Sequence, residues 1–379
     1  MRQFSFLILI IYIFSFQEKS HSQNSDPNLE KGINYIYDIK FDSATMIFDE
    51  IILKNPENPQ GYFFKMIIEW WKINLDKENE SNDANFIKSV DKVIEVTDKI
   101  LDKNDNDFTA LFYKGGAIGY RGLVRSMRDS WLKAAEDGRE ALNLFGTASE
   151  LNPNDKDISF GIGLYNYFAE YVPDKYPFVK PLMILFPSGN KSKGLFQIQD
   201  AADNSRFAKN EARSILVYLY LNYEKNFEEA EKHSRILLNK FPNNSLFERY
   251  LARSYTRRGL WDSVYKTWNG IILKSDSNLA GYNIINLKRE GNYYIALSLS
   301  ELGRIAEAYP YIQKLNEISD ANGIKPDAYT AYNYLLLGMY YDKLGERDNA
   351  INAYKKVLSL ENFDNSHTSA NRFLQTPYK

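Results

Sequence analysis

Apolar residues recur every three or four positions along most of the chain, and the strict alternation typical of β-strands is hard to find. That spacing is typical of a helix with one buried face. Proline is sparse, with 12 residues, and four of them fall between positions 173 and 187. The pattern therefore predicts an all-α chain with one irregular region near those prolines.

The clearest helical pair covers residues 334–357. Two amphipathic runs meet at Gly345, and glycine is common just past a helix end because it adopts positive φ at little cost. Gly338 lies inside the first run, where glycine costs about 1 kcal/mol relative to alanine. We therefore expect Gly338 to allow a close approach of the second helix, with Ala350 facing it.

The distance of 12 residues between two small residues recurs along the chain. It is found at Gly32 and Ala44, Ala296 and Ala308, Gly338 and Ala350, and, with a larger second member, Ala252 and Val264. Turn glycines accompany three of these pairs, at Gly259, Gly303 and Gly345. Prolines that end helices follow at Pro56, Pro153 and Pro242. Such repetition predicts an array of similar helical hairpins.

These features resemble the tetratricopeptide repeat (TPR) family, whose 34-residue unit is a helix–turn–helix with small residues at its eighth and twentieth positions. The units are 25–58, 211–244, 245–278, 289–322 and 331–364. The resemblance implies an all-α, right-handed α-solenoid of TPR-like helical hairpins. The array is expected over residues 23–364, with a C-terminal tail at 365–379.

The middle of the array, about 107–195, is predicted to be irregular. Residues 107–128 and 130–151 form two long helices, and a glycine-rich stretch from Phe160 to Tyr171 leads into the proline-rich segment and a surface loop at 188–194. This order weakly resembles, over about 107–244, the eukaryotic tetratricopeptide repeat protein 39 family, which clears inclusions at the mitochondrial outer membrane. That resemblance implies a scaffold.

The N-terminus is expected to be a signal peptide. An apolar run of 13 residues, Phe4 to Phe16, follows Arg2, whereas a membrane-spanning helix needs about 20. Small residues at Ser20 and Ser22 place the cleavage site after Ser22. The chain is then exported, periplasmic or secreted, and has no transmembrane span after cleavage. An uncleaved N-terminal anchor is the alternative.

Composition excludes several functions. The 47 lysines and arginines nearly balance the 49 acidic residues, so the chain lacks the net positive charge of a nucleic-acid coat protein. It has no cysteine, which excludes disulfides, thiolate metal sites and thiol nucleophiles. After cleavage only His233 and His367 remain, without metal-site spacing. We expect no catalytic, cofactor-binding or metal-binding residues.

Two rows of basic residues are candidate partner-binding sites. Residues 249, 253 and 257 share one face of a helix, and in the TPR pattern this face lines the inner groove. Arginine side chains there can form paired hydrogen bonds with carboxylates. A second row lies on helix 107–128. The candidates are Arg249, Arg253, Arg257, Lys114, Arg121, Arg125 and Arg128. The alternative is that these cations pair with acidic residues of neighbouring repeats.

Aromatic residues of the irregular segment are candidates for a ligand pocket or for a hydrophobic plug that fills space between helices. They are Tyr165, Tyr167, Phe168, Tyr171, Tyr176 and Phe178. Taken together, the sequence predicts a non-catalytic exported scaffold without a cofactor, which binds a protein or peptide in the concave groove of a TPR superhelix. The alternative is a cell-envelope protein that binds a small ligand or glycan through exposed aromatic rings.

Overall fold

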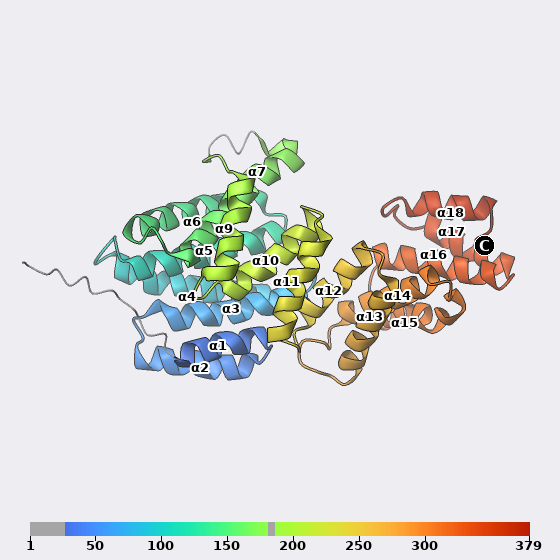
Figure 1. The fold of residues 1–379 in the computed structure, drawn as a ribbon, viewed down its shortest axis with the longest axis horizontal. Helices are drawn as coiled ribbons and strands as arrows, with labels where there is room; N and C mark the ends of the chain where they lie inside the picture. The colour runs from blue at the N-terminus through green and yellow to red at the C-terminus, as the bar shows by residue number, and fades with distance from the viewer. Residues whose placement is uncertain (1–26, 181–185) are drawn as a thin grey trace, which may run out of the picture.

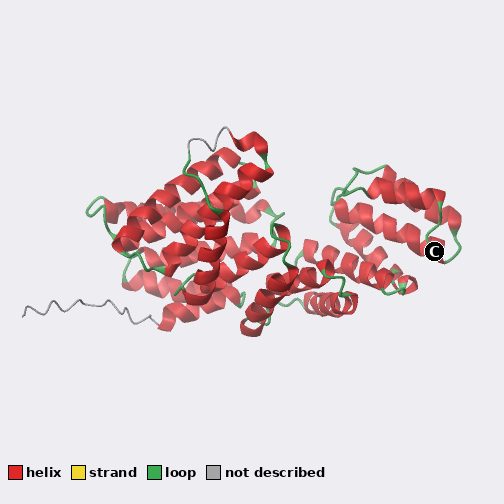
Figure 2. Cartoon of the chain, turned by 45° about the horizontal axis from the view of Figure 1, so that its top comes forward, coloured by secondary structure: helices red, strands yellow, loops and turns green. Residues whose placement is uncertain are grey.

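The computed structural model describes residues 27–180 and 186–379, so the predicted signal peptide at 1–22 lies outside the described residues. The described ranges contain seventeen α-helices, three short 3-10 helices and no strand, which confirms the all-α prediction (Figure 2). The α-helices are α1 (Pro27–Tyr37), α2 (Phe41–Lys54), α3 (Pro59–Leu75), α4 (Asp83–Leu101), α5 (Phe108–Met127), α6 (Trp131–Leu151), α7 (Lys156–Lys175), α9 (Lys191–Asn204), α10 (Lys209–Asn222), α11 (Phe227–Lys240), α12 (Ser245–Arg257), α13 (Trp261–Asp276), α14 (Ile285–Glu301), α15 (Tyr309–Ala321), α16 (Ala328–Lys343), α17 (Arg347–Leu358) and α18 (Ser366–Gln375).

Consecutive helices pair into hairpins that stack in chain order, from α1–α2 to α16–α17 (Figure 1). The turn glycines were predicted correctly, because Gly259, Gly303 and Gly345 all have positive φ, between 68° and 78°. Each lies just past the end of the first helix of its hairpin. The repeat register is therefore set by residues that can adopt a left-handed turn.

The small residues within helices lie against rings of the partner helix. A Cβ added at Gly32 would lie 2.7 Å from Cε1 of Phe48, and the atoms nearest to a Cβ at Gly338 all belong to the ring of Tyr354. The expectation that Ala350 faces Gly338 was therefore inaccurate: the facing residue lies one turn further on. Glycine leaves space for a buried aromatic ring. That ring buries more apolar surface than the methyl group of an alanine at the glycine position would.

The irregular middle is also a helical hairpin, formed by α7 and α9. A Cβ at Gly194 would lie 2.6 Å from the carbonyl oxygen of Gly163, so both glycines permit a close crossing of the two backbones. The prediction of a surface loop through Gly194 was wrong for its second half, because α9 begins at Lys191. Asn190 caps this helix by accepting a hydrogen bond from the Lys193 amide, at 2.8 Å.

The first helices of the chain pack against helices from its middle, α10 and α12 (Figure 1). The carboxylate of Glu211 on α10 is buried and accepts hydrogen bonds from the indoles of Trp70 (2.9 Å) and Trp71 (3.1 Å) and from the Tyr37 hydroxyl (3.3 Å). Burial raises the pKa of Glu211. These three donors compensate a polar group that would otherwise be costly to bury.

The helices from α13 onward extend away from this closed body as an arm (Figure 1). The predicted C-terminal tail contains helix α18, which packs on α16 and α17. Arg347 donates hydrogen bonds to the carbonyl oxygens of Phe373 (2.9 Å) and Leu374 (2.7 Å), at the end of α18. This contact satisfies helix-end carbonyls that have no partner within the helix.

Replacing Gly338 by alanine should destabilise the arm, because the added methyl group would collide with the buried ring of Tyr354. We expect a loss of about 1–3 kcal/mol in the free energy of unfolding, typical of overpacking. Gly146→Ala is the matched control: this helical glycine has no neighbouring atom within 4 Å of the added Cβ, so we expect a gain of about 0.5–1 kcal/mol. Urea unfolding of both variants tests this, and equal effects would contradict the packing described.

Candidate functional site

The first row of arginines lies on α12 and meets a buried carboxylate from the next hairpin. Arg249 donates two hydrogen bonds to Oε2 of Glu290 on α14, at 2.7 and 3.1 Å, and Arg253 binds Oε1 at 2.6–2.7 Å. The Glu290 side chain is only 2% exposed. Burial alone would raise its pKa, but the two guanidinium groups hold the pKa of Glu290 below its usual value.

Part of this row remains available to a ligand. The Arg253 side chain is 36% exposed despite its contact with Glu290. Arg257, one turn further along α12, is exposed. Within the described ranges no carboxylate lies at ion-pair distance from Arg257. The row therefore combines a structural ion pair at one end with an unneutralised guanidinium at the other.

Tyrosines from the next two hairpins continue this surface. On α14, Tyr294 lies close enough to Arg253 and Arg257 for both charges to lower its pKa, although burial raises that pKa overall. Tyr329 on α16 has its ring centroid 5.4 Å from that of Tyr293 and 6.4 Å from that of Tyr294. All three tyrosines are half-buried. We call Arg253, Arg257, Tyr293, Tyr294 and Tyr329 the arginine–tyrosine surface.

The second row of cations, on α5, is engaged by neighbouring helices. Its partners are Asp98 for Lys114, Asp137 for Arg121 and Arg125, and Asp83 for Arg128, each at 2.7 Å. Asp137 is almost fully buried. Arg128 also donates to the carbonyl oxygen of Lys77, at 2.8 Å. These contacts fix helices to one another and leave the row little free charge for a ligand.

Most of the candidate aromatic residues pack inside the hairpin of α7 and α9. Tyr167 is fully buried, and its hydroxyl donates a hydrogen bond to Glu224. Phe168 and Tyr171 pack against the same core, which includes Tyr223 of α10. The hydroxyl of Tyr165 donates to the carbonyl oxygen of Pro187, at 2.9 Å. These four residues therefore mainly pack between helices and do not line a ligand pocket.

The two remaining aromatic candidates lie at the end of this hairpin. Tyr176 is 40% exposed, and its ring lies 6.0 Å from that of Trp131. The side chain of Phe178 lies outside what the structure describes. Tyr176 is not part of the arginine–tyrosine surface.

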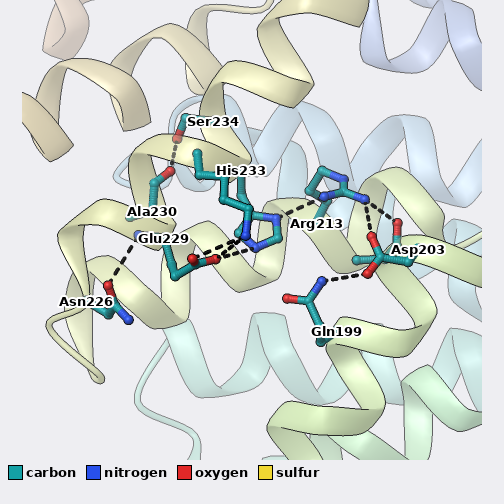
Figure 3. A network of polar contacts seen from close by, with 10 residues as sticks. Gln199, Asp203, Arg213, Asn226, Glu229, Ala230, His233 and Ser234 are labelled. Carbon is teal, nitrogen blue, oxygen red and sulfur yellow. Dashed lines mark hydrogen bonds and ion pairs between the residues drawn. The ribbon is translucent and has the colours of Figure 1, made fainter.

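His233 is buried, and it belongs to a polar network that joins α9, α10 and α11 (Figure 3). Arg213 donates to Nδ1 of the imidazole at 3.0 Å and to Asp203 at 2.7 Å. Since arginine can only donate, Nδ1 must be unprotonated and the proton sits on Nε2, 3.5 Å from Glu229. Burial and the Arg213 charge lower the pKa of His233 to about 4.

No group of three or more histidine or acidic residues in the described ranges is arranged to hold a metal ion. None of the helices there combines the length and apolar character of a membrane span. Sequence reasoning missed Glu290, Tyr294 and Tyr329, which complete the arginine row. The only available signal was their place on the first helices of the two following repeats.

Comparison with known proteins identifies one repeat directly. Residues 331–364, which cover α17 and all but the first turn of α16, match the tetratricopeptide repeat family. The match has the same boundaries as the predicted unit, so the TPR prediction is confirmed there. The resemblance to the tetratricopeptide repeat protein 39 family and the export of the chain stay predictions.

Solved structures that match this chain share little sequence with it. A TPR protein of Thermus thermophilus is 17% identical, with a TM-score of 0.37 over 60% of this chain and 96% of that one. A tetratricopeptide repeat protein of Parabacteroides merdae is 16% identical, with a TM-score of 0.32 over 92% and 98%. Human IFIT1, solved as a dimer with m7Gppp-AAAA, is 13% identical, with a TM-score of 0.34 over 85% and 68%.

The histidine network predicts a loss of stability in mild acid. The pKa of His233 is about 4 in the fold but about 6.5 in an unfolded chain. Between these values the unfolded chain binds a proton that the folded protein excludes. The stabilisation is therefore complete above pH 6.5 and falls by about 1–3 kcal/mol as the pH drops toward 4.

Urea unfolding at several pH values between 7 and 4 measures this loss. In His233→Asn, the amide oxygen can replace Nδ1 as the acceptor for Arg213, and that part of the pH dependence should disappear. His367→Asn, at a half-buried histidine of α18, is the matched control and should keep the wild-type slope. A constant difference between His233→Asn and wild type at every pH would show that His233 does not titrate as described.

Proposed function

We propose that this chain is a non-catalytic scaffold that binds an acidic segment of a partner protein on the arginine–tyrosine surface. The observation that carries the proposal is the exposed Arg257, which has no carboxylate at ion-pair distance in the described ranges. It stands beside Arg253, whose guanidinium is partly exposed. The charge of Arg257 is therefore available to an anionic ligand.

The position of the surface in the array supports a groove. The helices that carry it, α12, α14 and α16, are each the first helix of their hairpin. In TPR-like arrays the first helices line the concave side, which such proteins offer to extended ligands. The inner face of the first hairpins is filled by their own packing around Trp70 and Trp71, so we place the proposed binding surface on α12, α14 and α16.

The chemistry of the surface suits a carboxylate-rich peptide. Guanidinium groups form paired, charge-assisted hydrogen bonds with carboxylates. Burial and the neighbouring Glu290 raise the pKa of Tyr329, so its hydroxyl stays protonated and can donate. Tyrosine rings offer contact area at a small cost in side-chain entropy. Because Glu290 already fixes Arg253, binding requires little rearrangement of that side chain.

We further propose that the scaffold is exported. The support is the apolar run from Phe4 to Phe16 and the small residues before position 23. N-terminal sequencing of the protein isolated from its native cells should begin at Gln23. A chain that keeps the segment, recovered in the membrane fraction, would show that the segment is an anchor.

The binding proposal predicts that Arg257→Glu weakens the capture of an acidic peptide at least tenfold, which corresponds to about 1.4 kcal/mol. The probe is an N-acetylated, fluorescein-labelled octapeptide of alternating aspartate and glutamate, measured by fluorescence anisotropy. A neutral octapeptide of asparagine and glutamine should not bind.

Lys266→Glu is the matched control, because Lys266 is an exposed cation on the second helix of the same hairpin. It makes the same change in net charge and should leave binding intact at moderate salt. Equal losses in both variants would mean that the peptide senses only overall charge. No binding by the wild type would refute the acidic-partner proposal.

A further inference from the structure

We infer that the anion site on α12 is completed by Lys77, a residue of the loop between α3 and α4, so that a bound acidic segment contacts the N-terminal body and the arm at once. This inference rests on the proposed function and adds a further residue that contacts the bound segment. It makes the site composite: its cations come from two parts of the chain that are about 170 residues apart in sequence.

The segment that leads into Lys77 is held against α12 and α14 by the carbonyl group of Leu75, at the end of α3, and by the side chain of Asp76. The carbonyl oxygen of Leu75 accepts a hydrogen bond from Arg249, at 3.0 Å. Asp76 accepts one from Asn286, which lies at the start of α14, at 3.0 Å. The same loop therefore touches both the helix that carries the arginine row and the helix that carries Glu290.

The other side of the loop is fixed to the N-terminal body. Arg128, at the end of α5, donates to the carbonyl oxygen of Lys77 at 2.8 Å and to both oxygens of Asp83 at 2.7 and 3.0 Å. Arg128 was a candidate for partner binding, and in the structure it positions this loop instead. With its backbone held on both sides, Lys77 projects its side chain from a defined place.

The ammonium group of Lys77 lies over the ring of Tyr218 on α10, 4.6 Å from the ring centroid. Tyr218 is half-buried, as is Lys77. Within the described ranges no carboxylate is at ion-pair distance from this lysine. A cation that is partly withdrawn from water, without an anionic partner, is a group that an anion can stabilise.

Two arginines and two carboxylates lie near enough to act on the charge of Lys77. Arg249 and Arg253 face it from α12; Glu211 faces it from α10, and Glu78 follows it in the loop. Glu211 is fully engaged by the donors of α1 and α3, and Glu290 is shared by two arginines. Within the described ranges Glu211 and Glu78 form no ion pair with Lys77, and Glu290 pairs only with Arg249 and Arg253, so Lys77 and Arg257 are the two cations here without a paired carboxylate.

The position of Lys77 among these charges has a measurable consequence. Burial, together with the charges of Arg253 and Arg249, lowers the pKa of Lys77 to about 8. An anion binds the protonated form and raises that pKa. The affinity for an acidic peptide should therefore fall as the pH rises from 7 to 9, because a growing fraction of the lysine must first be protonated.

The other groups at the site keep their charge over that range. Arginine stays protonated, and the carboxylates of the peptide are fully ionised. The pKa values of Tyr294 and Tyr329 are raised above the usual value of 10. The pKa of Lys77, about 8, falls within this window, so the lysine gains and loses its proton there.

The experiment uses the full chain and the acidic octapeptide described above. Lys77→Met keeps an unbranched stem on the Tyr218 ring but removes the charge. We expect it to weaken binding about five- to tenfold at pH 7, a typical effect of one charged contact, and to remove the decline between pH 7 and 9. Lys77→Arg should bind at least as tightly as wild type and show a flat profile, because its side chain does not titrate there.

Lys266→Met is the matched control, with the same loss of charge on an exposed helix face, and it should keep both the affinity and the pH dependence of wild type. Circular dichroism melts check that each variant is folded. If the peptide binds and depends on Arg257 but Lys77→Met has wild-type affinity and wild-type pH dependence, the inference is wrong and the proposed function stands. If wild type does not bind the peptide, the proposed function fails first.

Discussion

A single hairpin of two short helices cannot bury its apolar face alone, and the whole structure depends on how neighbouring hairpins cover one another. Close packing here depends on glycines of one helix that face an aromatic ring of the next. Within hairpins, Gly32 faces Phe48 and Gly338 faces Tyr354; between hairpins, Gly161 of α7 faces Phe145 of α6. Each pair places a large apolar side chain within van der Waals distance of a backbone, where burial is most complete. Stability therefore accumulates along the array.

The N-terminal body adds a second kind of contact, between helices distant in sequence. Tyr37, Trp70 and Trp71 meet Glu211 across more than 130 positions of sequence. A buried carboxylate with three donors specifies one arrangement of these helices, since any other would leave the charge unpaired. The closure also fills the inner face of the first hairpins with aromatic side chains. A ligand surface is consequently left to α12 and the arm.

The sequence was informative about features that repeat locally. The positions of Gly259, Gly303 and Gly345 follow from the backbone conformation that a tight turn needs, and the boundaries of the last unit coincide with the family match. It could not reveal that Glu211 meets Trp70, because no periodicity encodes a contact between distant repeats. For the same reason the sequence did not single out Lys77, which is one of several charged residues between α3 and α4.

The arginine row shows why structural pairing and ligand binding need not be alternatives. Glu290 brings one negative charge to two guanidinium groups, so the pairing that fixes Arg249 and Arg253 leaves one positive charge unmatched before Arg257 is counted. A guanidinium group that is already fixed has lost its side-chain entropy, so the binding of an anion to it has a smaller entropic cost. The Glu290 carboxylate thus holds the guanidinium groups in place, so one ion pair can both stabilise the fold and preorganise the proposed site.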